Sequence, residues 1–423
     1  MRNNVLPRAF RRGSVTLVAM ALVGASTGVL GGATAVAENS AAPDPIQPTD
    51  VDPDLAAAVT GQMLAGATTM SAELGFTPSA QDVLVEGQRA TADRSWVFGG
   101  SVVRLPSDVD GSPRAMLFLG HRENGTWRVA LEGSQEFASL VRQAPDAVVP
   151  DPERPVLAKT ADPAPMDAPL GLSLPWKLGD SWGSAGVHGD SGSSRPYNAI
   201  DFHGGDSRVL AARAGKIYRF CTRGTRWHFL KVYHDNGWTT GYYHTRYQTS
   251  KGNGAHVAAG EFLGQTGNEL PCGGRSSGAH VHFTLWQGDR AVGVHGKTIG
   301  GWTFYEGSRP YSGYAVHEGR RVNFPASNGS LRNYGPGNTT ATGTVRNDGG
   351  WVNLRSGPGT SYDKVGALRD GTVVEIACTA RGEELTGPWN NKSDIWDRLP
   401  DGKWISDAFV DTGTNEPVAP SCA

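Results

Sequence analysis

The sequence predicts a mainly β protein in several parts, with an antiparallel β-sheet at its centre. Three observations support this. The chain has 423 residues, more than one ordinary domain needs. It contains 57 Gly and only 19% charged residues, which favours short strands and many turns over long helices. In the middle of the chain, strand-like segments alternate with Gly and Asn turns; they span 208–212, 215–220, 229–234 and 239–244.

The N-terminus predicts export. Residues 1–37 begin with a positive stretch, continue with a small and apolar run over 15–32, and end in a small-residue cleavage motif at 35–37. A membrane anchor is the alternative, but a run rich in Gly, Ala and Ser before a good cleavage motif favours a signal peptide. No second segment is apolar enough to span a bilayer. We therefore expect a secreted protein without a membrane span after processing.

Export makes cysteine pairing possible. The four cysteines, Cys221, Cys272, Cys378 and Cys422, allow three connectivities. Pairing within each half of the chain is the simplest, and each bridge would then close a loop of roughly 45–50 residues, worth up to about 4 kcal/mol on the chain-entropy model. No CxxC spacing occurs, which argues against a metal role for these residues. The net charge of −2 gives no sign of a nucleic-acid binder.

Residues 38–143 form a first exported part, which we interpret as an α+β prosegment. A helix is expected over 55–74, followed by strands at 96–103, 115–119 and 127–131. Residues 144–169 are rich in Pro, Ala and Asp, and we expect an exposed linker with a processing site there. A permanent accessory domain is the alternative to a prosegment.

Residues 170–325 form the central domain, and nine of the eleven histidines lie between His188 and His295. A stretch rich in Gly, Ser, Asn and Thr, 326–342, predicts a flexible linker. Residues 343–423 contain short strand-like segments around 352–354, 371–376 and 403–405, and a small β-barrel is expected for a unit of this size.

The most informative motif is Gly278-Ala279-His280-Val281-His282. Residues two apart on a strand point to one face, so His280 and His282 can face the same space. If His188 and Asp201 reach that space, three ligands and one free imidazole surround a metal, which is the inventory of a catalytic zinc site with an open water position. An HxH pattern alone is a weak signal, because a strand can carry two histidines for packing.

Flanking elements strengthen this interpretation. A Gly-rich turn over 273–278 precedes the HxH pair, and the segment 241–244 ends a predicted strand at His244. A zinc ion acidifies its bound water, a nearby histidine can take the proton, and donors near the metal can hold the oxyanion formed from an amide. The residue types therefore suit amide hydrolysis.

These motifs together resemble the lysostaphin-like zinc endopeptidases of bacterial cell walls, and within them the β-lytic endopeptidase and staphylolysin branch. The resemblance covers about residues 172–320. It rests on Leu174-Pro175-Trp176, Ser181-Trp182, His188 with Asp201, Tyr242-Tyr243-His244, 264–267, Cys272 and 276–283. It implies His188, Asp201 and His282 as ligands of one Zn²⁺ per chain, and the Cys221–Cys272 pairing fits the branch.

The same resemblance implies His244 and His280 as the catalytic histidines, which orient or deprotonate the water. Tyr311 falls where the branch carries a tyrosine that hydrogen-bonds the oxyanion, although the preceding loop differs and Tyr305 and Tyr314 are rivals. Tyr243 is expected to line the substrate groove.

The other histidines have a structural interpretation. His203 lies two residues after Asp201 and is a rival ligand, but it fits the family spacing poorly. We expect the rest to be surface or turn residues: His228, His234, His256, His295 and His317.

The C-terminal unit resembles bacterial SH3-like domains over about residues 343–411, on the motif 352–362. Such domains often bind wall peptides. Five aromatic residues could form a groove, or could mostly fill the core of a small barrel: Trp351, Tyr362, Trp389, Trp396 and Trp404.

From this sequence we expect a secreted, wall-associated, monomeric zinc metalloendopeptidase that hydrolyses peptide cross-links of peptidoglycan, with glycyl bonds favoured from the resemblance alone. Its partners would be the peptide stems and cross-bridges of the wall, not nucleic acid. A non-catalytic wall-binding or regulatory relative is one alternative, and a broader exported protease for Gly-rich proteins is another.

Overall fold

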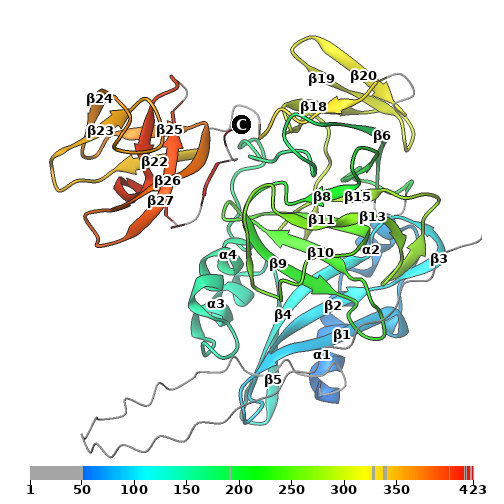
Figure 1. The fold of residues 1–423 in the computed structure, drawn as a ribbon. Helices are drawn as coiled ribbons and strands as arrows, with labels where there is room; N and C mark the ends of the chain where they lie inside the picture. Colours follow the sequence, from blue (N-terminus) through cyan, green and yellow to red (C-terminus); the bar gives the residue numbers. More distant parts are fainter. Residues whose placement is uncertain are drawn as a thin grey trace, which may run out of the picture. The chain divides into compact units, whose positions relative to one another are not determined.

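The computed structural model describes residues 51–189, 192–325, 329–336, 341–399, 401–413, 415, 417–419 and 422. The predicted signal peptide, 1–37, lies outside the described residues. The fold is mainly β, as predicted, with several antiparallel sheets and a few short helices (Figure 1). No helix in the described ranges is long and apolar enough to cross a membrane.

The N-terminal region packs helices against a four-stranded antiparallel sheet of order β1-β2-β4-β5. The single helix predicted over 55–74 is wrong in extent, because one helix ends at Leu64 with Ala65 as its C-cap and a second begins after Gly66, its N-cap. Asp52 caps the first helix by accepting hydrogen bonds from the backbone of Asp54 and Leu55, a contact typically worth about 1 kcal/mol. The elements are α1 (Pro53–Leu64), α2 (Ala67–Leu74), β1 (Val83–Ala90), β2 (Trp96–Val103), β3 (Leu105–Asp110), β4 (Arg114–Glu123), β5 (Thr126–Leu131) and α3 (Gln135–Gln143).

Residues 144–169 are not an exposed linker throughout, which corrects the expectation from their Pro content. A short helix, α4 (Arg154–Lys159), forms there. Val148, Val149 and Leu157 are fully buried in the same core as the N-terminal sheet. Apolar side chains spaced between the prolines outweigh the effect of the prolines, because burial of each one stabilises the fold by about 1.5–3 kcal/mol. Cleavage in this segment stays a prediction.

The central domain is built on an extended sheet whose main path runs β12-β9-β10-β11-β15-β7-β6-β21. In Figure 1, β9, β10, β11 and β15 lie in the green part of the chain. The strands are β6 (Ser181–His188), β7 (Ala199–His203), β8 (Arg208–Leu210), β9 (Gly215–Phe220), β10 (Phe229–Tyr233), β11 (Trp238–Arg246), β12 (His256–Val257), β13 (Phe262–Glu269), β14 (Gly273–Arg275), β15 (Val281–Gln287) and β16 (Arg290–Ala291).

The turn between β10 and β11 sets the register of this sheet. Asn236-Gly237 is a typical hairpin sequence, and Gly237 takes a φ of 81°, which a residue with a Cβ rarely adopts. The backbone NH of His234 donates to the carbonyl of Trp238, which closes the loop at 2.9 Å. From there the strands pair antiparallel through Leu230 opposite Tyr242.

A second, four-stranded sheet follows in the order β17-β18-β19-β20. Its strands are β17 (Thr298–Ile299), β18 (Trp302–Glu306), β19 (Gly313–His317) and β20 (Arg320–Phe324).

The flexible linker predicted over 326–342 is wrong for the described residues 331–333. There β21 (Leu331–Arg332) pairs with β6, and Leu331 is fully buried in the central core. The Asn333 side chain donates to the carbonyl of Trp176 at 2.6 Å. The central core therefore extends past the predicted boundary at 325.

The C-terminal unit contains a three-stranded sheet of order β25-β22-β29 and a five-stranded sheet of order β24-β23-β28-β27-β26. Its strands are β22 (Ala341–Val345), β23 (Trp351–Arg355), β24 (Lys364–Arg369), β25 (Val373–Ile376), β26 (Cys378–Thr386), β27 (Lys392–Arg398), β28 (Trp404–Ser406) and β29 (Val410–Asp411).

Both disulfides predicted by pairing within each half are confirmed. Cys221 bonds Cys272, and Cys378 bonds Cys422. The first joins the end of β9 to the turn before β14, so it fixes the chain just ahead of the HxH motif.

The N-terminal region and the central sheet share one hydrophobic core. Phe98 and Leu117 of the N-terminal sheet belong to the same buried cluster as Phe220, Phe229 and Tyr233 of the central sheet. Buried ionic contacts cross the same boundary. Lys231 Nζ lies 2.8 Å from Glu132 Oε1 with both side chains almost fully buried, and Tyr218 Oη donates to Glu153.

Candidate metal centre

Sheet register brings the first two candidate ligands together. On β15, His282 stands directly opposite Asp201 of β7, while Phe283 pairs with Ile200. Directly opposed residues of an antiparallel pair place their side chains on the same face, with Cβ atoms roughly 4.5–5.5 Å apart. Because side chains alternate along each strand, Phe283 and Ile200 enter the central core while His282 and Asp201 face away from it.

His188 completes the group from the end of β6. The residue opposite Asp201 on β6 is Gly186, beside an irregularity in the register. Gly186 has a φ of 119°, and a Cβ there would lie 2.8 Å from the backbone of Tyr311. This glycine therefore lets the 311 segment approach β6 and leaves the space over Asp201 to the His188 ring.

The donor atoms of these three residues converge. Asp201 Oδ1 lies 3.0 Å from His282 Nδ1 and 3.1 Å from His188 Nε2. Tetrahedral ligands at about 2.0–2.2 Å from zinc lie roughly 3.3–3.6 Å from one another, so small outward shifts would place all three on one ion. His188 Nδ1 faces the Gly189 carbonyl at 3.0 Å, which makes Nδ1 the donor and leaves Nε2 with a free lone pair. Two nitrogens and one carboxylate oxygen fit zinc.

The charges of His188, Asp201 and His282 also favour a bound cation. Burial opposes ionisation of Asp201, but the neighbouring His188 and His280 outweigh it and hold the carboxyl pKa well below its usual range. Burial disfavours the charged form of His188, yet Asp201 outweighs that effect and raises the His188 pKa. Burial lowers the pKa of His282. A buried carboxylate beside two imidazoles is a site prepared for a cation.

Two further histidines surround this group. His280 Nδ1 faces the Gly278 carbonyl at 2.6 Å, and His244 Nδ1 faces the Glu269 carbonyl at 3.0 Å. In both rings this contact makes Nδ1 the donor. His244 Nε2 has no hydrogen-bond partner within the described part of the chain, whereas His280 Nε2 lies 3.5 Å from Asp201 Oδ1. The two rings lie 4.8 Å apart. Burial, with the nearby His280 and His282, lowers the pKa of His244 to about 3, so this ring is neutral near pH 7.

Tyr311 stands over the group from the loop before β19. Its ring stacks on the His188 ring with centroids 4.3 Å apart. Its backbone NH donates to the Val187 carbonyl at 2.9 Å, which anchors the loop to β6. The rivals Tyr305 and Tyr314 instead stack on each other at 4.8 Å, and neither ring contacts this histidine group.

The expectation that Tyr243 lines the groove is wrong in the full chain. Its side chain is fully buried. Its hydroxyl donates to the Gly273 carbonyl at 2.7 Å and accepts from the Cys272 NH at 3.0 Å. Tyr243 therefore holds the turn before β14 rather than facing a substrate.

The remaining histidines do not join the centre. His203 is exposed. His234 is buried, which corrects the surface prediction, because its two ring nitrogens are satisfied by the Ala214 carbonyl and the Thr240 hydroxyl.

Sequence reasoning missed two residues beside the centre. The Tyr311 hydroxyl donates to Asp110 Oδ2 at 2.9 Å, and Arg275 Nη2 lies 3.8 Å from the same oxygen. No local pattern indicates the first contact, since 201 positions separate the two residues.

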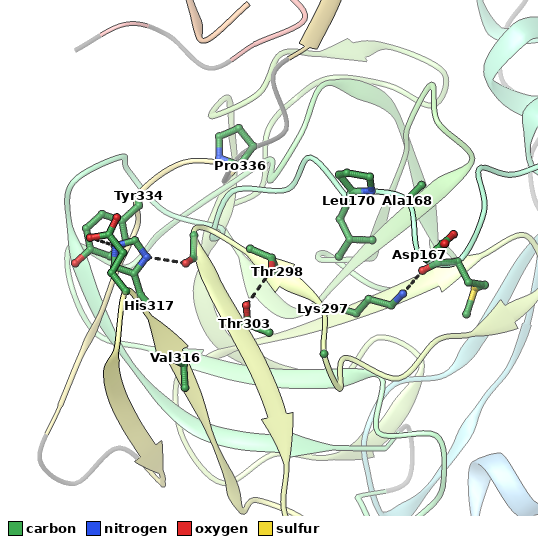
Figure 2. A pocket seen from close by; sticks show the side chains of 15 residues that line it. Asp167, Ala168, Leu170, Lys297, Thr298, Thr303, Val316, His317, Tyr334 and Pro336 are labelled. Carbon is green, nitrogen blue, oxygen red and sulfur yellow. Dashed lines mark hydrogen bonds and ion pairs between the residues drawn. The ribbon is translucent and has the colours of Figure 1, made fainter. Parts of the chain in front are cut away.

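A cavity of about 1010 Å³ lies elsewhere in the fold, and its lining includes none of the five clustered residues. Figure 2 shows Tyr334 against His317, whose rings stack at 3.7 Å, and the Thr298 and Thr303 hydroxyls 3.0 Å apart. Lys297 donates to the Met166 carbonyl at its rim. Donor chemistry rather than cavity size therefore selects the candidate site.

A β-sheet that presents two histidines and a carboxylate to one point, with two further imidazoles beside them, has the donor set of a zinc metallopeptidase site. Comparison with known proteins agrees: residues 195–294 match the model of peptidase family M23. The chain belongs to peptidase family M23. The family expected from the motifs is thus confirmed.

Relatives match different lengths of the chain. Protease LasA of Pseudomonas aeruginosa (strain PAO1) is 28% identical over 262 residues, which cover 57% of this chain and 61% of LasA. The chain thus spans about three fifths of that relative. The beta-lytic metalloendopeptidase of Lysobacter enzymogenes is 29% identical over 144 residues, 31% of this chain and 77% of that protein. Among solved structures, the M23 metalloprotease pseudoalterin is 32% identical over 39% of this chain and 99% of its own, with a TM-score of 0.35.

Proposed function

We propose that this protein is a secreted zinc endopeptidase that hydrolyses peptide cross-links of bacterial peptidoglycan. The observation that carries the proposal is the convergence of His188 Nε2, His282 Nδ1 and Asp201 Oδ1 within hydrogen-bonding distance of one point. The names of the relatives, a protease and a beta-lytic metalloendopeptidase, support the reaction class. The disulfides support an oxidising, extracellular location.

His188, Asp201 and His282 would hold one Zn²⁺, with a net positive charge left over. When bound, that ion supplies a Lewis acid and lowers the pKa of a coordinated water towards 7. The chain's own groups do the rest. His280 and His244 would use their Nε2 atoms to accept a proton and return it to the leaving amine.

Tyr311 would steady the developing oxyanion. Its ring is fixed on His188, and burial together with the nearby Asp201 and Asp110 raises the pKa of its hydroxyl, so the hydroxyl stays a donor. One positioned donor of this type contributes roughly 100-fold to 1,000-fold in rate.

Glycyl bonds are the proposed substrate, on family resemblance. The C-terminal unit would bring the enzyme to the wall. Trp351, Tyr362 and Trp389 are 64%, 47% and 52% exposed, which suits an aromatic binding surface, whereas Trp396 is core at 1%. Exposed aromatic side chains contribute to binding surfaces in proportion to the area they bury.

The deciding experiment uses protein purified from the medium of a host that expresses the full sequence. We expect about one zinc per chain, clearing of purified cell walls, and loss of clearing with a chelator that zinc reverses. The His280→Ala variant should keep its zinc and lose clearing. Zinc-free, inactive but folded protein would favour a non-catalytic wall-binding relative. Faster cleavage of a Gly-rich soluble protein than of walls would favour a general exported protease.

A further inference from the structure

A strand of the N-terminal region pairs with the strand that leads into the HxH motif. β3 runs parallel to β14, with Leu105 opposite Gly273 and Asp110 opposite Arg275. The Leu105 NH donates to the Cys272 carbonyl at 3.0 Å. Within the described residues β14 pairs with β3 alone. Without β3, β14 would therefore present unpaired backbone groups, which are a template for another extended chain.

This edge is built for close approach by a backbone. Gly273 and Gly274 take φ values of 87° and 86°. A Cβ on Gly273 would lie 2.2 Å from the Leu105 carbonyl oxygen, and one on Gly274 would lie 3.2 Å from that of Val109. Two consecutive glycines thus admit a main chain where side chains would exclude it.

The end of β3 lies at the candidate metal centre. Asp110 Oδ2 accepts the hydrogen bond of the Tyr311 hydroxyl at 2.9 Å, and that ring stacks on His188. The space between β3 and the 310–311 segment measures about 420 Å³ and is lined by Asp108, Asp110, Gly192, Arg275 and Tyr311, among others. The end of the strand therefore lines this space and places a carboxylate on Tyr311, the residue proposed to hold the oxyanion.

We infer that the β14 edge binds the substrate's peptide backbone as an added extended strand, and that residues 105–110 occupy this place in the full chain. The Asp110 carboxylate stands where the oxygen of the attacked carbonyl would lie. The inference rests on the proposed function. Added strands gain affinity from main-chain hydrogen bonds, which suits a substrate with small side chains.

Residues 105–110 compete well with a substrate for the β14 edge because they belong to the same chain. A segment joined to the same chain acts at an effective concentration of the order of millimolar or higher. A soluble peptide at micromolar concentration should therefore not displace residues 105–110 from the β14 edge. We expect the full chain to cleave peptides slowly until β3 leaves this edge.

The test compares full-length, zinc-loaded wild type, Asp110→Ala and the matched control Asp108→Ala on a soluble glycyl peptide. The exposed Asp108 side chain lies on the same strand but makes none of the described contacts with Tyr311 or Arg275. Hydrogen exchange at the amides of 105–110 and 273–275 is measured in parallel. We expect Asp110→Ala to cleave roughly tenfold faster than the other two, because a hydrogen bond to a charged acceptor is lost. Its exchange at both segments should also rise.

Other outcomes separate the inference from the function beneath it. Equal cleavage by all three proteins, with equal exchange at 273–275, would overturn the inference and leave the proposed function standing. No cleavage of any wall peptide by any of them, with raised exchange only in Asp110→Ala, would overturn the proposed function and with it the assignment of this edge to substrate.

Discussion

At the scale of single residues, the hydrogen bond of one ring nitrogen decides which nitrogen of each histidine is available to a metal or a proton. His188 points Nδ1 at its neighbour's carbonyl and Nε2 at Asp201. His244 and His280 use Nδ1 in the same way, and the Nε2 of His280 lies farther from Asp201 Oδ1, at 3.5 Å. A backbone carbonyl fixes the tautomer of each ring, and so fixes which atom can take a metal or a proton.

Replacing Tyr311 by Phe should lower kcat roughly 100-fold to 1,000-fold in processed protein, with little change in KM, because the lost hydroxyl acts on developing charge. Steady-state kinetics on a soluble peptide measure both constants. Tyr305→Phe is the matched control and should match the parent. An equal loss in the two variants would contradict the assignment.

Acid should weaken the fold through His234. Burial lowers the pKa of His234 from 6.5 to about 4. Between those values the unfolded chain takes up a proton that the folded chain refuses, so stability falls as pH falls through this window, by up to about 3 kcal/mol. Urea unfolding at pH 7 and pH 4.5 checks this. His234→Gln should be less stable at pH 7 but should lose less between the two pH values. The same loss in both proteins would assign the acid sensitivity to other groups.

At the scale of elements, buried charges hold the N-terminal sheet to the central one. Lys231 of β10 donates to Glu132 Oε1 and to the Ala115 carbonyl, each at 2.8 Å, while Glu132 Oε2 accepts from the Leu117 NH and the Tyr233 hydroxyl. All four contacts cross between or fasten the two sheets, so the pair specifies how they dock.

Breaking that pair should be costly. Glu132→Gln leaves the Lys231 ammonium buried without its counter-charge and should destabilise the full chain by about 3–5 kcal/mol in urea unfolding. The double variant Glu132→Gln with Lys231→Met should recover most of the loss, since no unpaired charge stays buried. If the double variant is as unstable as the sum of the two single variants, the charges are not coupled.

The sequence predicts elements well where the signal is local. The Asn236-Gly237 turn and the alternation beside it predict the β10–β11 hairpin, and the spacing of the HxH pair predicts strand β15. Contacts between residues far apart in the sequence cannot be predicted from such local patterns. β3 and β14 pair in parallel across more than 160 positions, and Lys231 sits in a strand where a charged residue normally indicates exposure.

For the candidate site residues too, a prediction succeeds where the sequence pattern is specific and fails where it fits two different surroundings. The convergence of His188, Asp201 and His282 could be predicted because their residue types suit a metal and their family spacing is specific. Tyr243 could not be placed correctly, because a tyrosine beside a candidate catalytic histidine gives the same sequence pattern whether its hydroxyl faces a groove or a buried turn. Leu331 and Asn333 were hidden in a stretch whose composition indicates a linker.

At the scale of the whole molecule, the C-terminal unit is expected to act by local concentration rather than by chemistry. Deleting 343–423 should lower activity on whole walls but spare a soluble peptide, because tethering raises the local substrate concentration without a new contact at the metal. Turbidity clearing and peptide cleavage, run side by side, separate the two effects. Equal loss on both substrates would show that the unit supports the fold of the peptidase instead.

If residues 105–110 block the β14 edge as we propose, the shared core would delay activation after cleavage. Phe98 and Leu117 of the N-terminal sheet are fully buried in one cluster with Phe220 and Tyr233 of the central sheet. A protease that cuts the chain between 160 and 170 would therefore leave a nicked complex, still silent, held together without a covalent bond. The interval from the cut to the first cleaved cross-link would be set by how slowly that core opens, a rate rather than an equilibrium. Export and cleavage beside the wall of the producing cell would thus be separated in time from the start of peptidase activity.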